Sequence, residues 1–407
     1  MIQPAIKPTF SLLTVLLLSL PAELQAQSPQ KEPDVGRYAV ASRLDEFLGA
    51  PLVVPMQQLW KDRGGWGGTI TAKDGTVVVF QSPGGGNCRR SRDGGKTWDS
   101  DITIAPDAKG GRALVDETKG DLLYANPGAG WLFRSRDHGV TWTRESVQVR
   151  PDGFGLSPKS GGVTAMQAGI TLAFGNHLGR LIMPARIAGP TGSNDVPWRP
   201  YHYSTALYSD DGGAVWQTSK PFPVFGTGEA ALAELSDGSI LYNSREHMSR
   251  GNRYFAWSHD GGDLWIGAMQ SPDLPDGARG TSYGCMGGMI RLPVAGHDVL
   301  LYSNLDTDAG EMPAKVGAST NKGREKITVW ASFDAGRTWP VKRLVYDGPS
   351  AYSNLGVGRT GTPSQGKIYL VFEGGPTGCY EAVHVVSFNL SWLLDGRDVS
   401  AFLKNGR

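Results

Sequence analysis

The sequence predicts an all-β fold, a six-bladed β-propeller, from a repeated motif, the spacing of its copies and the composition of the chain. The pattern Ser-x-Asp-x-Gly-x-x-Trp occurs five times, at residues 91–98, 135–142, 209–216, 258–265 and 332–339. Successive copies begin 44, 74, 49 and 74 residues apart, and a four-stranded propeller blade takes about 40 to 50 residues. The 56 glycines and 26 prolines favour short strands and tight turns over helices.

Each copy of this motif, the Asp-box, has the chemistry of a tight β-hairpin. Asp can bond nearby backbone groups and Gly accepts a positive φ, while Trp packs beneath the turn. Two of the intervals fit one blade and two fit a blade with an insertion, of which residues 188–203 are the longest. Strand-like runs at 367–372 and 382–388 add a blade after the last box, and only residues 391–403 leave room for helix.

Three segments are expected along the chain. Residues 1–26 are typical of a secretory signal peptide, since Lys7 precedes an apolar run and small residues near Ala22 and Ala26 offer a cleavage site. That run is too short for the ~20 residues of a membrane span, so the protein should be exported, to the periplasm or the extracellular space. Residues 36–395 should form the propeller and 396–407 a C-terminal tail.

Charge and cysteine content exclude several classes of partner. A net charge of +1 with 19% charged residues gives no broad basic face for nucleic acid. Cys88, Cys285 and Cys379 permit one disulfide and one free thiol, or simple packing in the core. None of them stands at a metal-ligand spacing, so neither a metal nor another cofactor is expected.

Five stretches outside the Asp-boxes are informative about function through their order and spacing along the chain. They are residues 169–172 with 179–182, residues 228–235 with 241–245, Arg324, residues 350–353, and Phe372 with Glu373. In order and spacing they resemble the exo-α-sialidase (neuraminidase) family with Asp-box (BNR) repeats. The resemblance implies a sialidase-like propeller that acts on sialylated or other acidic-sugar glycans.

The resemblance also implies roles for individual residues. Tyr352 would be the nucleophile of a retaining glycosidase and Glu229 its base, while Arg245 and Arg324 would bind the substrate carboxylate and Glu373 would orient a clamp arginine. A tyrosine suits this chemistry because the carboxylate on the anomeric carbon of a sialic acid would repel a carboxylate nucleophile. The planar fork of arginine holds a carboxylate with two hydrogen bonds.

Glu234 is a competing candidate for the base. It lies five residues after Glu229, so in a regular strand its side chain would point to the opposite face.

The N-terminal third departs from the family pattern. Residues 64–68 stand where the family has an Arg-Ile-Pro motif with its first clamp arginine, and Arg63 is the nearest substitute, with a surface role as the alternative. Residues 81–88 contain no acid where the family has its general-acid Asp. Candidate replacements, each weighed against a solvated-loop role, are Asp62, Asp195 and His202.

Three functions are compatible with these residues. The first is an exported exo-glycosidase that releases terminal sialic acid or a related nonulosonic acid. The second is a lectin-like propeller that binds a sugar acid without turnover, and the third is a protein-binding propeller. Tyr352 together with Glu229 favours the enzyme, because binding alone needs no nucleophile.

Overall fold

The computed structural model describes residues 43–82, 86–150, 162–188, 196–248, 250–276, 284–306 and 323–403, without the side chains of 196–198. The expected signal peptide and Asp195 lie outside the described residues. Within the described part of the chain, no helix is long and apolar enough to cross a membrane.

The described strands assemble into five hydrogen-bonded sheets, nearly all of whose strand pairs are antiparallel. The first sheet holds β2 (Gly68–Thr71), β3 (Val77–Gln81), β4 (Asn87–Ser91) and β5 (Ile102–Thr103), and the second holds β6 (Arg112–Asp116), β7 (Asp121–Asn126), β8 (Trp131–Ser135) and β9 (Thr143–Ser146). The third comprises β10 (Gln148–Val149), β11 (Val163–Ala165), β12 (Ile170–Thr171), β13 (Leu181–Ile187), β14 (Tyr203–Ser209) and β15 (Val215–Thr218). The fourth comprises β16 (Thr227–Glu234), β17 (Ile240–Glu246), β18 (Asn252–Ser258) and β19 (Ile266–Pro275).

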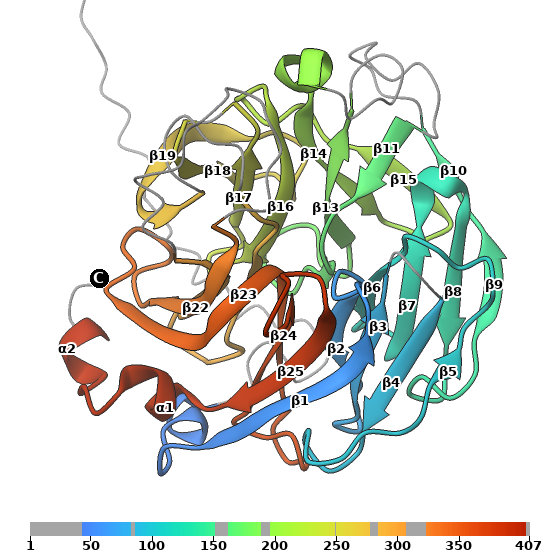
Figure 1. Cartoon of the computed structure of the whole chain (residues 1–407). Helices are drawn as coiled ribbons and strands as arrows, with labels where there is room; N and C mark the ends of the chain where they lie inside the picture. Colours follow the sequence, from blue (N-terminus) through green and yellow to red (C-terminus); the bar gives the residue numbers. More distant parts are fainter. Residues whose placement is uncertain are drawn as a thin grey trace, which may run out of the picture. The chain divides into compact units, whose positions relative to one another are not determined.

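The last sheet has seven strands because one long strand joins two groups. It contains β20 (Gly288–Arg291), β21 (Leu300–Leu305), β22 (Glu325–Ser332), β23 (Val341–Val357), β24 (Ile368–Gly374), β25 (Ala382–Phe388) and β1 (Val53–Lys61). The first half of β23 pairs with β22 up to Pro349, and its second half pairs with β24 from Ser350. The N-terminal strand β1 pairs with the C-terminal β25, which joins the two ends of the described chain (Figure 1).

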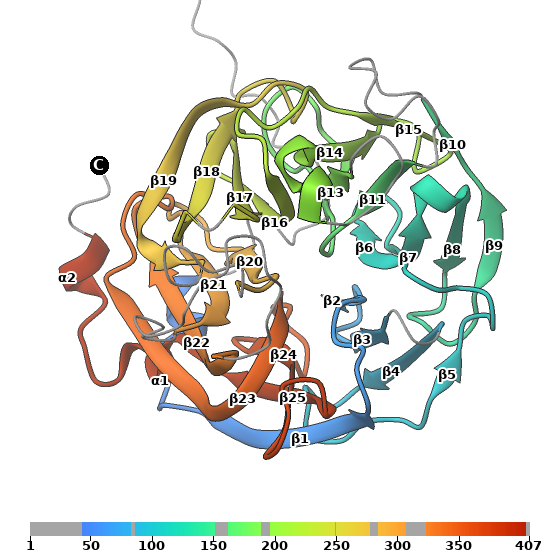
Figure 2. The same cartoon turned by 45° about the horizontal axis from the view of Figure 1, so that its top comes forward.

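The sheets follow one another in chain order around a ring, so the fold is an all-β, propeller-like arrangement (Figure 2). Short helices lie before, between and after the strands: η1 (Leu44–Phe47), η2 (Pro127–Ala129), η4 (Val196–Tyr201), α1 (Leu390–Leu394) and α2 (Ser400–Leu403). The two α-helices fall where the sequence leaves room for helix. The insertion at 188–203 separates β13 from β14 within the third sheet, as expected.

The Asp-boxes form the turns that their sequence predicts. In the third copy, Asp211 Oδ1 accepts the backbone N–H of Val215 at 3.0 Å, and Ser209 Oγ accepts that of Gly213 at 2.9 Å. Gly213 has φ +101°, a conformation that other residues rarely adopt. Trp216 is fully buried beneath the turn and donates its indole N–H to the Gly213 carbonyl at 2.8 Å.

All three cysteines are buried free thiols, so the possibility of a disulfide is wrong and the packing role is correct. Burial raises the pKa of Cys88 and of Cys285 to about 12, which keeps both thiols protonated and unreactive.

Candidate active site

The predicted nucleophile and the predicted base are in direct contact. The Tyr352 hydroxyl, on β23, donates a hydrogen bond of 2.8 Å to Glu229 Oε1 on β16. Tyr352 is 7% exposed and the Glu229 side chain 12%, so the pair is largely shielded from solvent. A shift in the β16–β17 register between Thr227 and Ala230 interrupts the regular alternation of the strand at Glu229.

The competing candidate for the base, Glu234, is occupied elsewhere. Its two carboxylate oxygens accept the backbone N–H groups of Ala173 at 2.6 Å and Phe174 at 3.0 Å. Burial raises the pKa of Glu234 to about 7 in spite of these bonds. Its carboxylate therefore fixes a loop and makes no contact with Tyr352.

Charges around the pair push the two pKa values apart. Burial raises the pKa of Tyr352 far above its ordinary value, and the negative charge of Glu229 adds to this rise. Burial alone would also raise the pKa of Glu229, but the positive charges of Arg245, His247 and Arg186 and the hydrogen bond from Arg245 together outweigh it and hold that pKa well below the usual carboxyl range. Glu229 is therefore ionised, and Tyr352 protonated, throughout the ordinary pH range.

Arg245, on β17, forms an ion pair and a hydrogen bond with Glu229 Oε2. Beneath them lies Arg253, a fully buried residue that donates to the Glu229 backbone carbonyl at 3.2 Å and to the Cys285 carbonyl at 3.0 Å. Its charge is balanced by Asp276, at 3.1 Å. The carboxylate of Glu229 is thus held through its own strand as well as through Arg245.

Arg324, just before β22, lies near the ring of Tyr352. Its guanidinium carbon is 5.5 Å from the centre of the Tyr352 ring. It donates to the Gly284 carbonyl at 3.0 Å and to the Tyr380 hydroxyl. A hollow of about 550 Å³ lined by residues 323–325, Pro349 and 377–381 opens beside it.

Arg63 belongs to the same group of side chains, although its side chain is 43% exposed. Its guanidinium carbon lies 4.0 Å from the ring centre of Tyr380, 4.9 Å from that of Trp66 and 5.9 Å from that of Tyr352. Its Nε is 3.8 Å from Glu373 Oε1, the carboxylate predicted to orient an arginine. The structure brings Arg63 and Glu373 together, but at a distance longer than a hydrogen bond.

The two described candidates for the missing acid differ in their exposure. Asp62 is exposed, with a backbone φ of +74°, and its N–H bonds the Glu381 carbonyl at 2.9 Å. His202 is completely buried and packs against His247 with ring centres 6.2 Å apart, so a solvated-loop role for His202 is wrong.

Two arginines of the site escaped prediction. Arg112, on β6, is buried and donates to the Met166 carbonyl at 2.7 Å. Its guanidinium carbon lies 5.9 Å from the centre of the Trp66 ring. Burial lowers the pKa of Arg112 to about 10. Arg186, on β13, packs so closely against the residue before Glu229 that a Cβ on Gly228 would lie 2.7 Å from Arg186 Cδ. The available signal was an arginine in a mostly apolar strand run, at 112–116 and 181–187.

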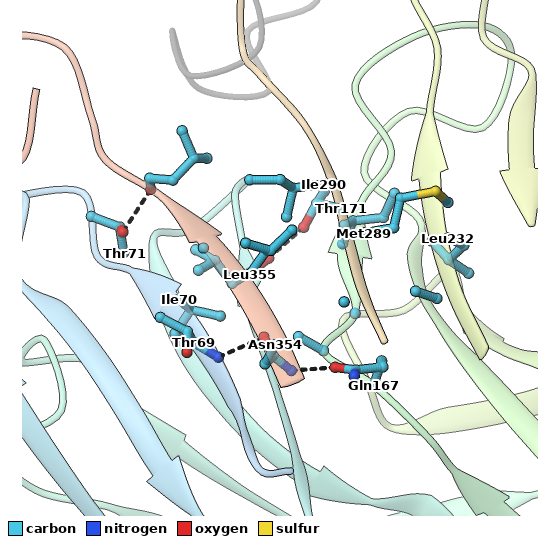
Figure 3. Close-up of a pocket in the computed structure, with 18 of the residues that line it drawn as sticks. Thr69, Ile70, Thr71, Gln167, Thr171, Leu232, Met289, Ile290, Asn354 and Leu355 are labelled. Carbon is cyan, nitrogen blue, oxygen red and sulfur yellow. Dashed lines mark hydrogen bonds between the residues drawn. The ribbon is translucent and has the colours of Figure 1, made fainter. Parts of the chain in front are cut away.

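The cavity at the centre of the ring, drawn in Figure 3, has a lining that does not include these residues. It measures about 110 Å³ and is lined by β2, β6, β12, β16, β20 and the second half of β23. Asn354 joins neighbouring strands there: its Oδ1 accepts the Thr69 N–H at 3.2 Å and its amide donates to Gln167 (Figure 3). Because Asn354 is two residues from Tyr352, these bonds fix the strand that carries the nucleophile.

No cluster of His, Cys, Asp and Glu able to hold a metal ion occurs among the residues of the described ranges. The polar groups at the site are arginines, two carboxylates and tyrosine hydroxyls, which is a donor set for an anionic organic ligand.

Comparison with protein families agrees with this donor set and fold. The family model of the BNR repeat-like domain matches residues 89–369. The chain therefore belongs to the sialidase family with BNR repeats.

Among curated relatives, a sialidase of Micromonospora viridifaciens is 32% identical over 229 residues, which is 55% of this chain and 30% of that protein. A sialidase of Bacteroides fragilis is 31% identical over 147 residues, covering 35% of this chain and 23% of that one. The chain thus spans less than a third of the length of these relatives.

Solved structures share the fold at low sequence identity. The Hadza microbial sialidase Hz136 superposes with a TM-score of 0.59 at 21% identity, over 80% of this chain and 65% of that one. The intramolecular trans-sialidase from Ruminococcus gnavus, solved with oseltamivir carboxylate, superposes with a TM-score of 0.58 at 15% identity, over 84% of this chain and 95% of that one.

Proposed function

We propose that the protein is an exported glycoside hydrolase that releases terminal sialic acid or a related nonulosonic acid from glycans with retention of configuration. The observation that carries this proposal is the 2.8 Å hydrogen bond from Tyr352 to Glu229, with Arg245 and Arg324 beside it. The relatives named sialidase support the same reaction class.

In this mechanism the arginines bind the carboxylate on the anomeric carbon. Arg245 and Arg324 are buried and fixed by hydrogen bonds, and Arg63 supplies a third guanidinium on the open side of the Tyr352 ring. The arginines place the anomeric carbon beside the Tyr352 hydroxyl, where a neutral nucleophile meets no repulsion from the substrate carboxylate. Glu373 does not contact the substrate in this mechanism; it fixes the segment that carries Arg63.

Proton transfer from Tyr352 to Glu229 must accompany the attack on the anomeric carbon. Ordinary tyrosine and glutamate pKa values of ~10 and ~4.3 differ by about 6 units, so transfer before bond formation would cost roughly 8 kcal/mol. Burial and neighbouring charges widen that difference. The proton therefore moves as the bond from the Tyr352 oxygen to carbon forms, and it returns when water releases the sugar.

The structure assigns no acid to the leaving oxygen: Asp62 is exposed with its N–H bonded to Glu381, and His202 is completely buried. Without protonation, a leaving group that is stable as an anion departs more readily than an alkoxide. The same observation supports the second candidate function, a lectin-like propeller that binds a sugar acid without turnover.

We also propose that the fold has six blades. The seven-stranded sheet then counts as two blades that share β23, and the six strands lining the central cavity are the innermost strand of each blade.

The test of function is an assay with purified protein. Turnover of 4-methylumbelliferyl glycosides of N-acetylneuraminic acid, other nonulosonic acids and uronic acids would be measured beside calorimetric titration with the free acids. Release of the fluorophore from a nonulosonic acid glycoside supports the enzyme, binding without release supports the lectin, and neither result would refute both.

A further inference from the structure

We infer that Trp66 is a positioning residue, held by Glu373, that orients both Tyr352 and Arg63. The inference rests on the proposed function, in which these two residues touch the substrate. It gives Glu373 a different role from the direct orientation of an arginine.

The hydrogen bonds of Glu373 go to the glycine-rich segment that carries Trp66. Glu373 is completely buried, and its Oε1 accepts the Trp66 indole N–H at 2.8 Å and the Gly64 backbone N–H at 3.0 Å. The Arg63 Nε lies 3.8 Å away, which is beyond hydrogen-bond distance. The short contacts of this carboxylate are therefore with the segment and its tryptophan.

Trp66 in turn touches the two residues that act on the substrate. Its ring packs edge-to-face against Tyr352, with centres 4.7 Å apart and planes at 77°, an arrangement that aromatic pairs favour. The Arg63 guanidinium lies 4.9 Å from the same ring, within the range of a cation–π contact. Trp66 thus links the buried carboxylate to the predicted nucleophile and to the exposed arginine.

The glycines around Trp66 allow this close packing. A Cβ on Gly67 would lie 2.5 Å from the Phe80 carbonyl oxygen, and one on Gly64 would lie 2.7 Å from Gln81 Cγ. The backbone at these positions lies directly against β3 and the residue at its end. Residues 64–68, which replace the family motif, therefore pack closely enough to hold the indole ring of Trp66 in place.

The decisive variants distinguish the role of Glu373 as a hydrogen-bond acceptor from the role of its negative charge. Glu373→Gln keeps an oxygen that can accept the Trp66 N–H, and its amide nitrogen can take the place of Oε2, which has no hydrogen-bond partner among the described residues. Glu373→Leu removes the acceptor, and Trp66→Phe keeps an aromatic ring but removes the donor. A matched control is Trp60→Phe. Trp60 lies on β1, outside the site, is buried, and donates its indole N–H to Asp101 at 2.9 Å.

We expect Trp66→Phe and Glu373→Leu each to lower kcat on an aryl nonulosonic acid glycoside by roughly 10- to 100-fold, the usual effect of a misplaced reacting group. The double variant should be no slower than either single one, since both remove the same link. Glu373→Gln should lose less kcat than Glu373→Leu, because it keeps the acceptor, and only the control Trp60→Phe should retain wild-type kcat; thermal melting of each variant would identify any that is unfolded.

Two kinetic results would overturn the inference: wild-type kcat in Trp66→Phe, or a loss in Glu373→Gln as large as in Glu373→Leu, which would mean that the charge acts on Arg63 directly. Absence of any wild-type turnover would instead refute the proposed function. The positioning role would then be decided by a crystal structure of Trp66→Phe. A lost hydrogen bond between Tyr352 and Glu229 would support the inference, and an unchanged one would overturn it.

Discussion

Replacement of Glu229 by Gln tests the site most sharply, because it changes turnover, acid binding and stability in different directions. The substitution keeps the size of the side chain and removes the negative charge that faces Arg245. Turnover should collapse, because an amide cannot take the Tyr352 proton. Binding of a free acid should become tighter, because the resident carboxylate no longer competes for the arginine.

The size of the binding effect follows from the charges. A ligand carboxylate on the far side of the Arg245 guanidinium would lie ~7 Å from the Glu229 carboxylate, and two like charges at that separation repel by roughly 2 kcal/mol at an effective dielectric constant of ~20. Loss of this repulsion corresponds to a Kd about 30-fold lower.

Stability should fall at the same time. Removing one partner of a buried ion pair typically costs ~3–5 kcal/mol, because the other charge stays buried without compensation. The pKa of Glu229 is depressed in the folded protein, so the ionised carboxylate stabilises the fold above its unfolded pKa of ~4.3, and this contribution is lost as the pH falls toward the folded pKa. The difference in unfolding free energy between wild type and Glu229→Gln should therefore be largest near neutral pH and shrink in acid.

Calorimetric titration with N-acetylneuraminic acid, urea unfolding and the aryl glycoside assay would measure the three effects. Glu117→Gln is the matched control, because Glu117 pairs with Arg359 at 2.6 Å in a similarly buried position at the central cavity. The control should lose stability without changing Kd or kcat. Retained turnover, or weaker acid binding, in Glu229→Gln would refute the assigned base and its competition with the ligand.

Three further predictions concern the nucleophile, the leaving group and the Asp-box. Tyr352→Phe should abolish release of the fluorophore while acid binding survives in calorimetry; full activity of this variant would show that another group attacks. Because no acid is assigned to the leaving oxygen, kcat/KM should rise steeply as the pKa of the aglycone falls across a series of aryl glycosides, and a flat series would show that a residue of the protein protonates the leaving group. Trp216→Ala should cost about 3 to 5 kcal/mol in urea unfolding, because it empties a fully buried indole site; a loss below about 1 kcal/mol would contradict the packing role of the Asp-box tryptophan.

The repeated local signals predicted the architecture well. Asp, Gly and Trp in the Asp-boxes act within a few residues of one another, so the turn around Asp211 and the burial of Trp216 follow from sequence alone. The partition of strands among sheets does not, because β23 runs on from one group of strands into the next through Pro349 and Ser350. A count of blades from motif spacing cannot detect such a shared strand.

The part of the site that the sequence predicted consists of residues whose types match the chemistry of the expected reaction. Tyr352, Glu229 and Arg245 come from different strands, and only their joint order in the sequence indicated that they meet. Arg112 and Arg186 were missed because their approach depends on how neighbouring sheets pack, which no local pattern records. His202 was misplaced for a related reason, since its burial against His247 depends on tertiary packing.

Both departures from the family pattern, the displaced arginine and the missing acid, lie in residues 62–88, and they affect different steps of the proposed reaction. Arg63 is partly exposed and held by aromatic rings, so ordering its long side chain on a ligand would cost up to ~2 kcal/mol in conformational entropy. The buried Arg245 and Arg324 have already lost this entropy on folding. That cost weakens ground-state binding and appears in KM. The absent acid weakens only departure of the leaving group and appears in kcat. Changes at Arg63 and changes of aglycone should therefore act independently, and a strong dependence of one on the other would mean that Arg63 itself contacts the leaving oxygen.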